Sequence, residues 1–268
     1  MSPEHVSSLP LLDDVAARLG TDRFGRWRRG FEVIGSTNTE AMRWAMEGAH
    51  EGSLVLAEQQ TAGRGRHGRT WQAAAGRNLT FSLVLRPPLA PARLGLLTLA
   101  ASLAVAESVE AVVVPVPVRI KWPNDVLIEG RKCCGMLLES SLAGSTPTVV
   151  LGIGLNVNQE HFAPPLDARA TSLRLAAGRP VPRAPLLADL LQRLEHHYDR
   201  LAHDADAVRH TYQDRLDGLG QPIVLRLSAQ HGLVRGRLAG VSRTGALRLD
   251  TPDGPRTFHA GDVTTNPA

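Results

Sequence analysis

A run of arginine and glycine is the part of this sequence with the most chemical content: it reads Gly63-Arg64-Gly65-Arg66-His67-Gly68-Arg69. Guanidinium groups bind carboxylate and phosphate oxygens in a bidentate manner. The glycines let the backbone approach a ligand closely. The run therefore predicts a loop that folds over an anionic substrate, although on its own it is more typical of a solvated basic loop or of a segment that binds RNA.

Two lysine-bearing stretches place polar groups where strands are expected to begin or end. In the first, a proline turn would present an Asn-Asp pair at a sheet edge: Lys121-Trp122-Pro123-Asn124-Asp125. The second is Lys132, which opens an expected strand. Taken singly, each also fits an ordinary turn or a solvent-facing lysine.

A third stretch carries two glycines near a strand end: Gly152-Ile153-Gly154-Leu155-Asn156-Val157-Asn158. Paired glycines of this kind allow close packing or the close approach of a ligand. The stretch is not a dinucleotide fingerprint, because the third glycine and the following helix are missing.

Taken in chain order, these stretches resemble the motifs of the biotin protein ligase family. The resemblance is carried by the segments 35–38 (Gly-Ser-Thr-Asn), 58–71 with its trailing Trp71, 121–125, 131–135 and 152–156. It is dense over about residues 31–160 and mostly architectural beyond them. Lipoate ligases and octanoyl transferases are similar in fold, but they are not expected to carry the Arg/Gly loop.

The resemblance implies an AMP-forming carbon–nitrogen ligase whose substrates are biotin and ATP. The biotin carboxylate would attack the α-phosphorus of ATP, which gives biotinyl-5′-AMP and pyrophosphate. A lysine of a biotin carboxyl carrier protein domain would then attack the activated carbonyl and release AMP. Because a carboxylate must approach a polyphosphate, cationic side chains and a divalent cation, expected to be Mg²⁺, have to offset the repulsion. The sequence does not indicate the metal ligands.

The resemblance also assigns residues to parts of this site. Lys132 and Arg66 are expected to be catalytic, with the Lys132 ammonium near both the biotin carboxylate and the α-phosphate. The residues expected to bind biotin are Ser36, Thr37, Asn38, Gln60, Arg64, Gly65, Arg66, Lys132, Gly135 and Asn156. The residues expected to bind the nucleotide are Arg66, Arg69, Trp71, Lys121, Asn124 and Asp125.

Composition sets wide bounds on the class of protein. The chain has 268 residues, of which 43% are hydrophobic and 21% charged, values that are ordinary for a soluble globular protein. A formal net charge of +4 does not choose among nucleic acid, phosphate and acidic protein partners. The only two cysteines, Cys133 and Cys134, are adjacent, which excludes a disulfide framework and favours a reducing, cytoplasmic location.

No secretory signal is readable at the N-terminus. The longest apolar run, 94–114, carries Glu107 and Glu110 and predicts a buried or amphipathic helix, so no membrane span is expected.

Periodicity predicts how the chain is organised. Helices are expected at 9–19, from Thr37 to about Gly48, from Pro91 to about Val112, at 186–201 and in a short piece ending near Leu216; Thr37 and Glu40 fit a capping box. Strands are expected at 31–34, 53–57, 79–85, 116–121, 126–128, 133–140 and 148–153. Residues 59–71 and 160–170 are expected to be loops.

From about residue 220 the pattern changes to short β-type runs at 223–227, 233–238, 246–249 and 256–259. The hairpin signal Asp253-Gly254 lies among them. We therefore predict an α+β fold with a helical N-terminal extension (1–30), a catalytic domain around a central mixed sheet of the biotin/lipoate ligase type (31–218) and a small SH3-like β-barrel (219–268).

Only about 35 residues precede Ser36, whereas the winged helix-turn-helix of repressor members of the family needs roughly sixty or more. A monofunctional enzyme that does not bind DNA is therefore expected, as a monomer or a homodimer. Three alternatives stay open: a lipoate-type ligase, a nucleic-acid-binding regulator whose binding depends strongly on salt, and a biotin sensor without catalytic activity. A thiol next to Lys132 also suggests an activity that is sensitive to oxidation.

Overall fold

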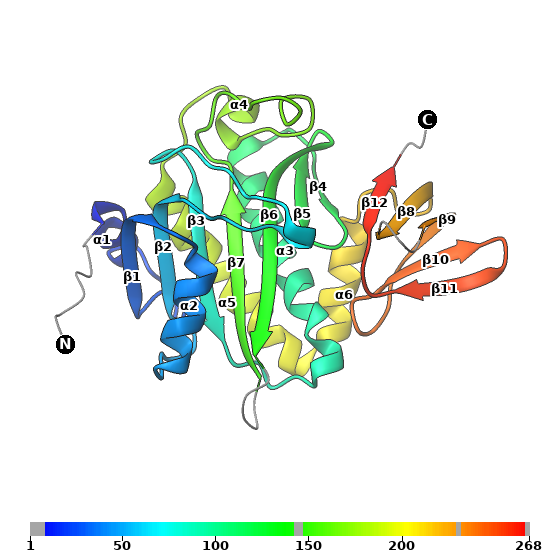
Figure 1. Cartoon of the computed structure of the whole chain (residues 1–268), viewed down its shortest axis with the longest axis horizontal. Coiled ribbons are helices and arrows are strands. Elements are labelled where there is room, and N and C mark those ends of the chain that lie inside the picture. The colour runs from blue at the N-terminus through cyan, green and yellow to red at the C-terminus, as the bar shows by residue number, and fades with distance from the viewer. Residues whose placement is uncertain (1–8, 142–146, 229–231, 266–268) are drawn as a thin grey trace.

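The computed structural model describes residues 9–141, 147–228 and 232–265. A seven-stranded sheet with helices on both faces is followed by a separate five-stranded sheet (Figure 1). The helices are α1 (Pro10–Ala16), α2 (Thr37–Met46), α3 (Gly95–Val113), α4 (Leu173–Ala177), α5 (Arg183–His203) and α6 (Ala205–Asp214), with short 3₁₀ turns at Arg66–Gly68 and Pro91–Arg93. The strands of the large sheet are β1 (Arg28–Ile34), β2 (Leu54–Gln60), β3 (Leu79–Leu85), β4 (Val118–Lys121), β5 (Asp125–Ile128), β6 (Arg131–Ser141) and β7 (Thr148–Leu155).

The large sheet has the strand order β1-β2-β3-β7-β6-β5-β4. Only the β1–β2 pair is parallel among the ladders of this sheet, so the central sheet is mixed, as the sequence predicted. Strand β3 is buried along its whole length. Its alternation sends Leu79, Phe81 and Leu83 into the main core and Val84 into a smaller apolar cluster under α2. Thr80 and Ser82 consequently lie on the α2 face of the sheet.

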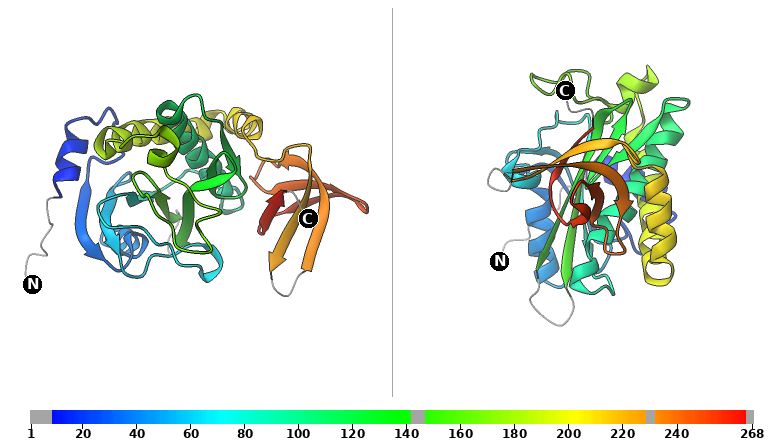
Figure 2. Two further views of the ribbon diagram at one scale, coloured as in Figure 1. Left: turned by 90° about the horizontal axis from the view of Figure 1, so that it is seen from above. Right: turned by 90° about the vertical axis from the view of Figure 1, so that its right-hand side faces the viewer.

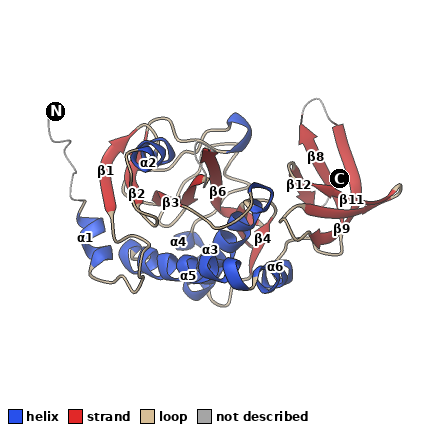
Figure 3. Cartoon of the chain, turned by 90° about the horizontal axis from the view of Figure 1, so that it is seen from below, coloured by secondary structure: helices blue, strands red, loops and turns tan. Residues whose placement is uncertain are grey.

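The two faces of the large sheet are covered unequally. Helix α2 packs on β2, β3 and β7, whereas α3 packs on β4, β5 and β6 and against α5 and α6. Figure 3 shows α3, α5 and α6 in one layer and α2 across the sheet from them. By length and composition, Pro91–Val113 could cross a membrane (mean hydropathy 1.8), but 72% of its most apolar window is buried inside the protein. It is therefore a buried core helix, the first of the two alternatives (buried or amphipathic) that the sequence left open.

The C-terminal sheet is antiparallel and consists of β8 (Pro222–Ser228), β9 (Gly232–Val241), β10 (Leu247–Thr251), β11 (Gly254–Phe258) and β12 (Asp262–Thr265) in the order β11-β10-β9-β8-β12. It lies at the β4 end of the large sheet, far from β1 (Figure 2). The indole Nε1 of Trp122 donates to the Gly245 carbonyl across this junction, at 3.0 Å. Within the described residues β11 and β12 form the two edges, so closure into an SH3-like barrel stays a prediction.

Several local predictions need correction. Ser36, not Thr37, is the N-cap of α2, and Glu40 binds Arg29 and Arg43 in place of a backbone N–H, so the predicted capping box is wrong. Strand β2 runs to Gln60, into the predicted loop, because it continues to pair with β1 there. Helix α4 and strand β12 were not predicted, since each is only four or five residues long.

Candidate active site

A row of small residues crosses the α2 face of the large sheet. Register places Thr80 of β3 opposite Gly154 of β7, Gly154 opposite Gly135 of β6, and Gly135 opposite Asp125 of β5. Directly opposed residues share a face of the sheet. The two glycines therefore leave a shallow strip of bare backbone that ends at the Asp125 carboxylate.

The indole of Trp71 lies on this strip. A Cβ added to Gly154 would come within 2.3 Å of the Trp71 ring, and one added to Gly135 within 3.3 Å of the same ring and 2.8 Å of Lys132 Nζ. Real Cβ contacts as short as 2.3 Å essentially never occur, so glycine at 154 permits Trp71 to lie there, whereas a Cβ at 135 would require the end of the Lys132 side chain to shift. This gives a physical reason for the glycines that the sequence singled out.

Two cations meet at the end of the strip. Lys132 Nζ lies 2.6 Å from Asp125 Oδ1, and the Arg66 guanidinium donates to Asn124 Oδ1 at 3.3 Å. Asn124 is itself fixed, because its side chain donates to the Met136 carbonyl at 2.6 Å. Burial lowers the pKa of Arg66, and the carboxylates of Asp262 and Asp125 only partly offset this effect. A guanidinium that is short of water and of full pairing is suited to bind an incoming anion.

Hydrogen-bonding capacity is left unused around Lys132. Its backbone N–H donates to Arg169, and its carbonyl accepts from Thr171, so the segment 169–171 runs beside it. Among the described residues, four buried polar atoms near this segment and the strip have no hydrogen-bond partner: Asp125 Oδ1, which is ion-paired with Lys132, and Trp71 Nε1, Asn156 Oδ1 and Thr171 Oγ1. Buried polar groups are normally satisfied. These atoms are thus candidates for contacts to a bound ligand.

A second group of predicted residues gathers at the start of α2. The backbone N–H of Thr37 donates to Gln60 Oε1 at 2.7 Å, and the Thr37 hydroxyl lies 3.0 Å from the same oxygen. The Asn38 carboxamide fills the space above Gly152, where an added Cβ would lie 2.1 Å from Asn38 Oδ1. Ser36 is buried beside them and has no side-chain capping bond. Gly152 lies two residues before Gly154 on β7, so the two groups are neighbours on one face of the sheet.

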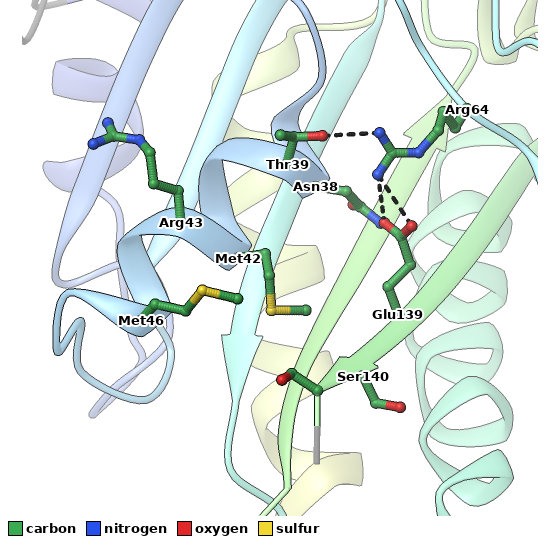
Figure 4. Close-up of a pocket in the computed structure, with 9 residues that line it drawn as sticks. Asn38, Thr39, Met42, Arg43, Met46, Arg64, Glu139 and Ser140 are labelled. Carbon is green, nitrogen blue, oxygen red and sulfur yellow. Dashed lines mark hydrogen bonds and ion pairs between the residues drawn. The ribbon is translucent and has the colours of Figure 1, made fainter. Parts of the chain in front are cut away.

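The Arg/Gly loop spans both groups. Arg64 donates through Nη2 to both oxygens of Glu139, at 3.0 and 2.9 Å, and through Nη1 to the Thr39 hydroxyl (Figure 4). At the other end of the loop, Arg69 forms an ion pair with Asp262 of β12. Arg66 also donates to the Gly261 carbonyl, at 3.4 Å. The loop is therefore held by the large sheet at one end and by the C-terminal sheet at the other.

The structure brings most of the predicted site residues into these two neighbouring groups. Gly65 contributes its backbone N–H to the Arg69 carbonyl, inside the loop. Lys121 ends β4 opposite Asp125, but within the described residues no hydrogen bond or ion pair joins its side chain to the other predicted residues. The sequence missed Ser82, Glu139 and Asp262. A serine in a largely apolar, fully buried strand was the available signal for Ser82; nothing in the pattern marked the other two.

The two cysteines lie beneath the site. Both are fully buried, and burial raises the pKa of each thiol, that of Cys134 with a contribution from its neighbour. The Cys133 thiol points to the Val126 carbonyl. Thiols in this state are unreactive, which argues against the predicted sensitivity to oxidation.

Comparison with known proteins identifies two matching family models. A model described as "Biotin/lipoate A/B protein ligase family" matches residues 30–156, and one described as "Biotin protein ligase C terminal domain" matches residues 218–264. The chain is 36% identical over 262 residues to a biotin–[acetyl-CoA-carboxylase] ligase of Mycobacterium tuberculosis, which covers 95% of this chain and 96% of the relative. It is 34% identical to a bifunctional ligase/repressor of Bacillus subtilis, over 91% of this chain and 76% of the relative.

The arrangement in space is similar as well. A biotin protein ligase from Aquifex aeolicus, solved in complex with biotin and ATP, superposes with a TM-score of 0.78. The match covers 91% of this chain and 100% of that one, at 27% sequence identity.

Proposed function

This chain belongs to the biotin protein ligase family, and from that premise we propose that it activates biotin with ATP as biotinyl-5′-AMP and transfers the biotinyl group to a lysine of a carrier protein. The observation that carries the proposal is the corner where Lys132 meets Asp125 and Arg66 meets Asn124. It sets two cations from distant parts of the chain at the end of a glycine strip covered by an aromatic ring. A carboxylate and an α-phosphate need such a place to meet.

In the first step, a carboxylate oxygen of biotin forms a bond to the α-phosphorus, and the bond to pyrophosphate breaks. Negative charge builds on the phosphorus oxygens as this happens. We assign its stabilisation to Lys132 and Arg66, with Arg69 toward the departing pyrophosphate. The Lys132 ammonium acts by position and charge, since an ammonium is no base. Trp71 is assigned to the adenine, with Lys121, Asn124 and Asp125 on the nucleotide side.

In the second step, the carrier lysine nitrogen attacks the activated carbonyl, loses a proton and releases AMP. The biotin end is assigned to the group around α2: Ser36, Thr37, Asn38, Gln60, Arg64 and Gly65, with Gly135 and Asn156 along the acyl chain. Among the described residues, no group of three or more His, Cys, Asp or Glu side chains is arranged to hold a metal ion. Mg²⁺ is therefore proposed to enter on the phosphates of ATP, an arrangement that suits its preference for phosphate and water oxygens.

We propose that the polypeptide is organised in three regions. Residues 31–218 form the catalytic domain and residues 219–268 the C-terminal domain, a division supported by two sheets that share no ladder. Residues 1–30 are proposed as an extension. The ion pair of Arg69 with Asp262 and the bond of Arg66 to Gly261 support a role for the C-terminal domain in holding the loop for the nucleotide.

The proposed partner is the biotin carboxyl carrier domain of a carboxylase. A reducing, cytoplasmic setting is proposed, and the two unpaired buried thiols support it. DNA is not a proposed partner, and sedimentation at enzyme concentrations used for assay would decide between monomer and homodimer.

Biotin-dependent exchange of labelled pyrophosphate into ATP tests the first step. Exchange with biotin but not with lipoate is expected, followed by biotinylation of a purified carrier domain. A lack of exchange with either acid would overturn the proposal, and exchange with lipoate alone would move the chain to a lipoate ligase.

A further inference from the structure

A chain of polar side chains runs through the base of α2. Glu139 Oε2 accepts from Asn38 Nδ2 at 2.7 Å, and Asn38 Oδ1 faces the Ser82 hydroxyl at 2.6 Å. The same hydroxyl lies 2.8 Å from Thr37 Oγ1, which in turn lies 3.0 Å from Gln60 Oε1. The chain therefore links three residues assigned to biotin through two residues, Ser82 and Glu139, that have no assigned role.

Strand register explains why these side chains meet. Ser82 of β3 is opposite Gly152 of β7, and Val84 is opposite Val150, which is opposite Glu139 of β6. All of them therefore lie on the α2 face. Gly152 has no side chain, and the Asn38 carboxamide occupies the space that a Cβ would need. Asn38 can thus reach Ser82 and Glu139 at once.

The hydrogen bonds of this polar chain run in one donor-to-acceptor direction, because the residues at its two ends allow only one. A carboxylate only accepts hydrogen bonds, so Glu139 requires Asn38 to turn its NH₂ outward and its carbonyl toward Ser82. The Ser82 hydroxyl must then donate its single proton to that carbonyl, so its oxygen can only accept from the Thr37 hydroxyl. At the other end, the backbone N–H of Thr37 holds Gln60 Oε1 at 2.7 Å, which leaves Gln60 Nε2 facing the space beside Gly63. The donors and acceptors offered to a ligand are consequently fixed before it arrives.

Glu139 also fixes the loop. Its two oxygens both accept from Arg64, whose other nitrogen donates to the Thr39 hydroxyl (Figure 4). Beside this junction is an open pocket of ≈520 Å³, lined also by Met42 and Met46, so the carboxylate stands between solvent and the buried polar chain. One carboxylate thereby sets both the start of the Arg/Gly loop and the buried amide of Asn38.

We propose that Glu139 and Ser82 are positioning residues for biotin, which orient Asn38 and Arg64 toward its cyclic urea. This inference rests on the proposed function and deepens it. A urea presents one carbonyl acceptor between two N–H donors, so its recognition depends on which way each facing amide and hydroxyl is turned. A site whose hydrogen-bond directions are set in advance holds such a ligand without the cost of reorganising on binding.

Two substitutions disturb the polar chain at separate points. In Glu139→Gln the new NH₂ must face either the Asn38 NH₂ or the Arg64 guanidinium, so two donors oppose each other. Ser82→Ala removes the hydroxyl that donates to Asn38 Oδ1. The matched control is Glu110→Gln, because Glu110 also accepts from one arginine, Arg215, at 2.8 Å, but lies on α3.

The test is pyrophosphate exchange by the full chain, with KM for biotin and for ATP measured for the wild type, both single variants, the double variant and the control. Each single variant should raise KM for biotin about tenfold, the size of one or two lost hydrogen bonds, and leave KM for ATP unchanged. Because both act on Asn38, the double variant should be no worse than the worse single variant. Glu110→Gln should match the wild type.

Three results would overturn the inference while exchange by the wild type upheld the proposed function. They are a wild-type KM for biotin in both single variants, a parallel rise of KM for ATP, which indicates a general structural effect, and fully multiplicative effects in the double variant. Thermal unfolding of each variant separates a misfolded protein from a misplaced side chain, and the two positions give independent chances to see the effect. No exchange by the wild type would instead overturn the proposed function.

Discussion

Lys132 Nζ lies 2.6 Å from Asp125 Oδ1 and 5.9 Å from the centroid of the Trp71 ring. The β5–β6 hairpin makes this arrangement, because a two-residue turn at Glu129 and Gly130, both with positive φ, brings the start of β6 beside β5. The ammonium is therefore held at the end of the glycine strip by a carboxylate of its own sheet. An ammonium has three N–H donors, so one salt bridge leaves some of them free for a ligand.

Lys132→Ala removes that charge from the place where the phosphorus oxygens are proposed to develop theirs. We expect pyrophosphate exchange to slow by about 100- to 1000-fold, the usual loss when one stabilising group is removed from a transition state. Biotin binding, measured by calorimetry without ATP, should fall much less. Exchange at the wild-type rate in this variant would contradict the assigned role of Lys132.

Gly154→Ala would place a Cβ 2.3 Å from the Trp71 ring. Because Trp71 lies in a loop, whereas β7 is paired on both sides with neighbouring strands, the indole and not the strand should be displaced. We expect KM for ATP to rise about tenfold, in the range of an overpacked contact, with a change in tryptophan fluorescence. Gly20→Ala is the control, since its Cβ would meet only the end of the flexible Gln192 side chain. An unchanged KM for ATP would remove Trp71 from the nucleotide site.

The sequence predicted the fold well where periodicity and length agree. Strand β3 matches the predicted 79–85, and α3 matches the apolar run 94–114, although the helix predicted to begin at Pro91 starts at Gly95 after a separate 3₁₀ turn. Predictions failed where an element is short or is stabilised from outside itself. Helix α4 has five residues, and its cap is the Ser172 hydroxyl, which accepts from Leu175 N. Strand β12 exists through its pairing with β8, which no local pattern reveals.

The site was predictable where its residues cluster in the chain and hidden where they do not. The Arg/Gly loop and the 121–125 turn are contiguous motifs, and the structure joins them through Arg66 and Asn124. Glu139 is an acidic residue near a strand end, a common surface pattern. Its place in the site depends on its ion pair with Arg64, 75 positions earlier in the chain. Asp262 likewise acquires its role only because the C-terminal sheet sits beside the loop.

The loop 61–71 should be cut by trypsin in the free enzyme and protected by biotin with ATP. Its side chains between Arg64 and Thr70 are exposed or half-exposed, so polar contacts alone hold it. Asp262→Asn removes the carboxylate that holds Arg69, and exposed ion pairs contribute little. We expect cleavage of the free variant to be about two- to fivefold faster. Asp253→Asn, in the β10–β11 turn, serves as control. Equal cleavage with and without ligands would contradict the proposed ordering of the loop.

Iodoacetamide should leave the native enzyme unmodified and fully active. Cys133 and Cys134 are both fully buried, and burial raises the pKa of each thiol, so thiolate is scarce and access is closed. Mass spectrometry should detect no adduct before unfolding and two adducts in denaturant. Rapid loss of exchange activity together with one adduct in the native protein would show that the β6 strand opens in solution.

Glu107 should stabilise the protein near neutral pH and lose this contribution in acid. Its carboxylate lies 3.0 Å from Nε2 of the buried His197 and 3.5 Å from Arg193, between α3 and α5. Burial alone would raise the pKa of Glu107, but the hydrogen bond and charge of His197, with the charges of Arg193 and Arg215, outweigh it and lower the pKa below the ordinary 4.5.

A carboxyl whose folded pKa is depressed stabilises the fold above its unfolded pKa and loses that stabilisation as the pH falls through the folded pKa. Glu107→Gln should therefore unfold at a lower temperature than the wild type near neutral pH, and the two unfolding temperatures should converge as the pH falls through the depressed folded pKa of Glu107. A constant difference in unfolding temperature across the whole pH range would show that packing, not charge, determines what Glu107 contributes.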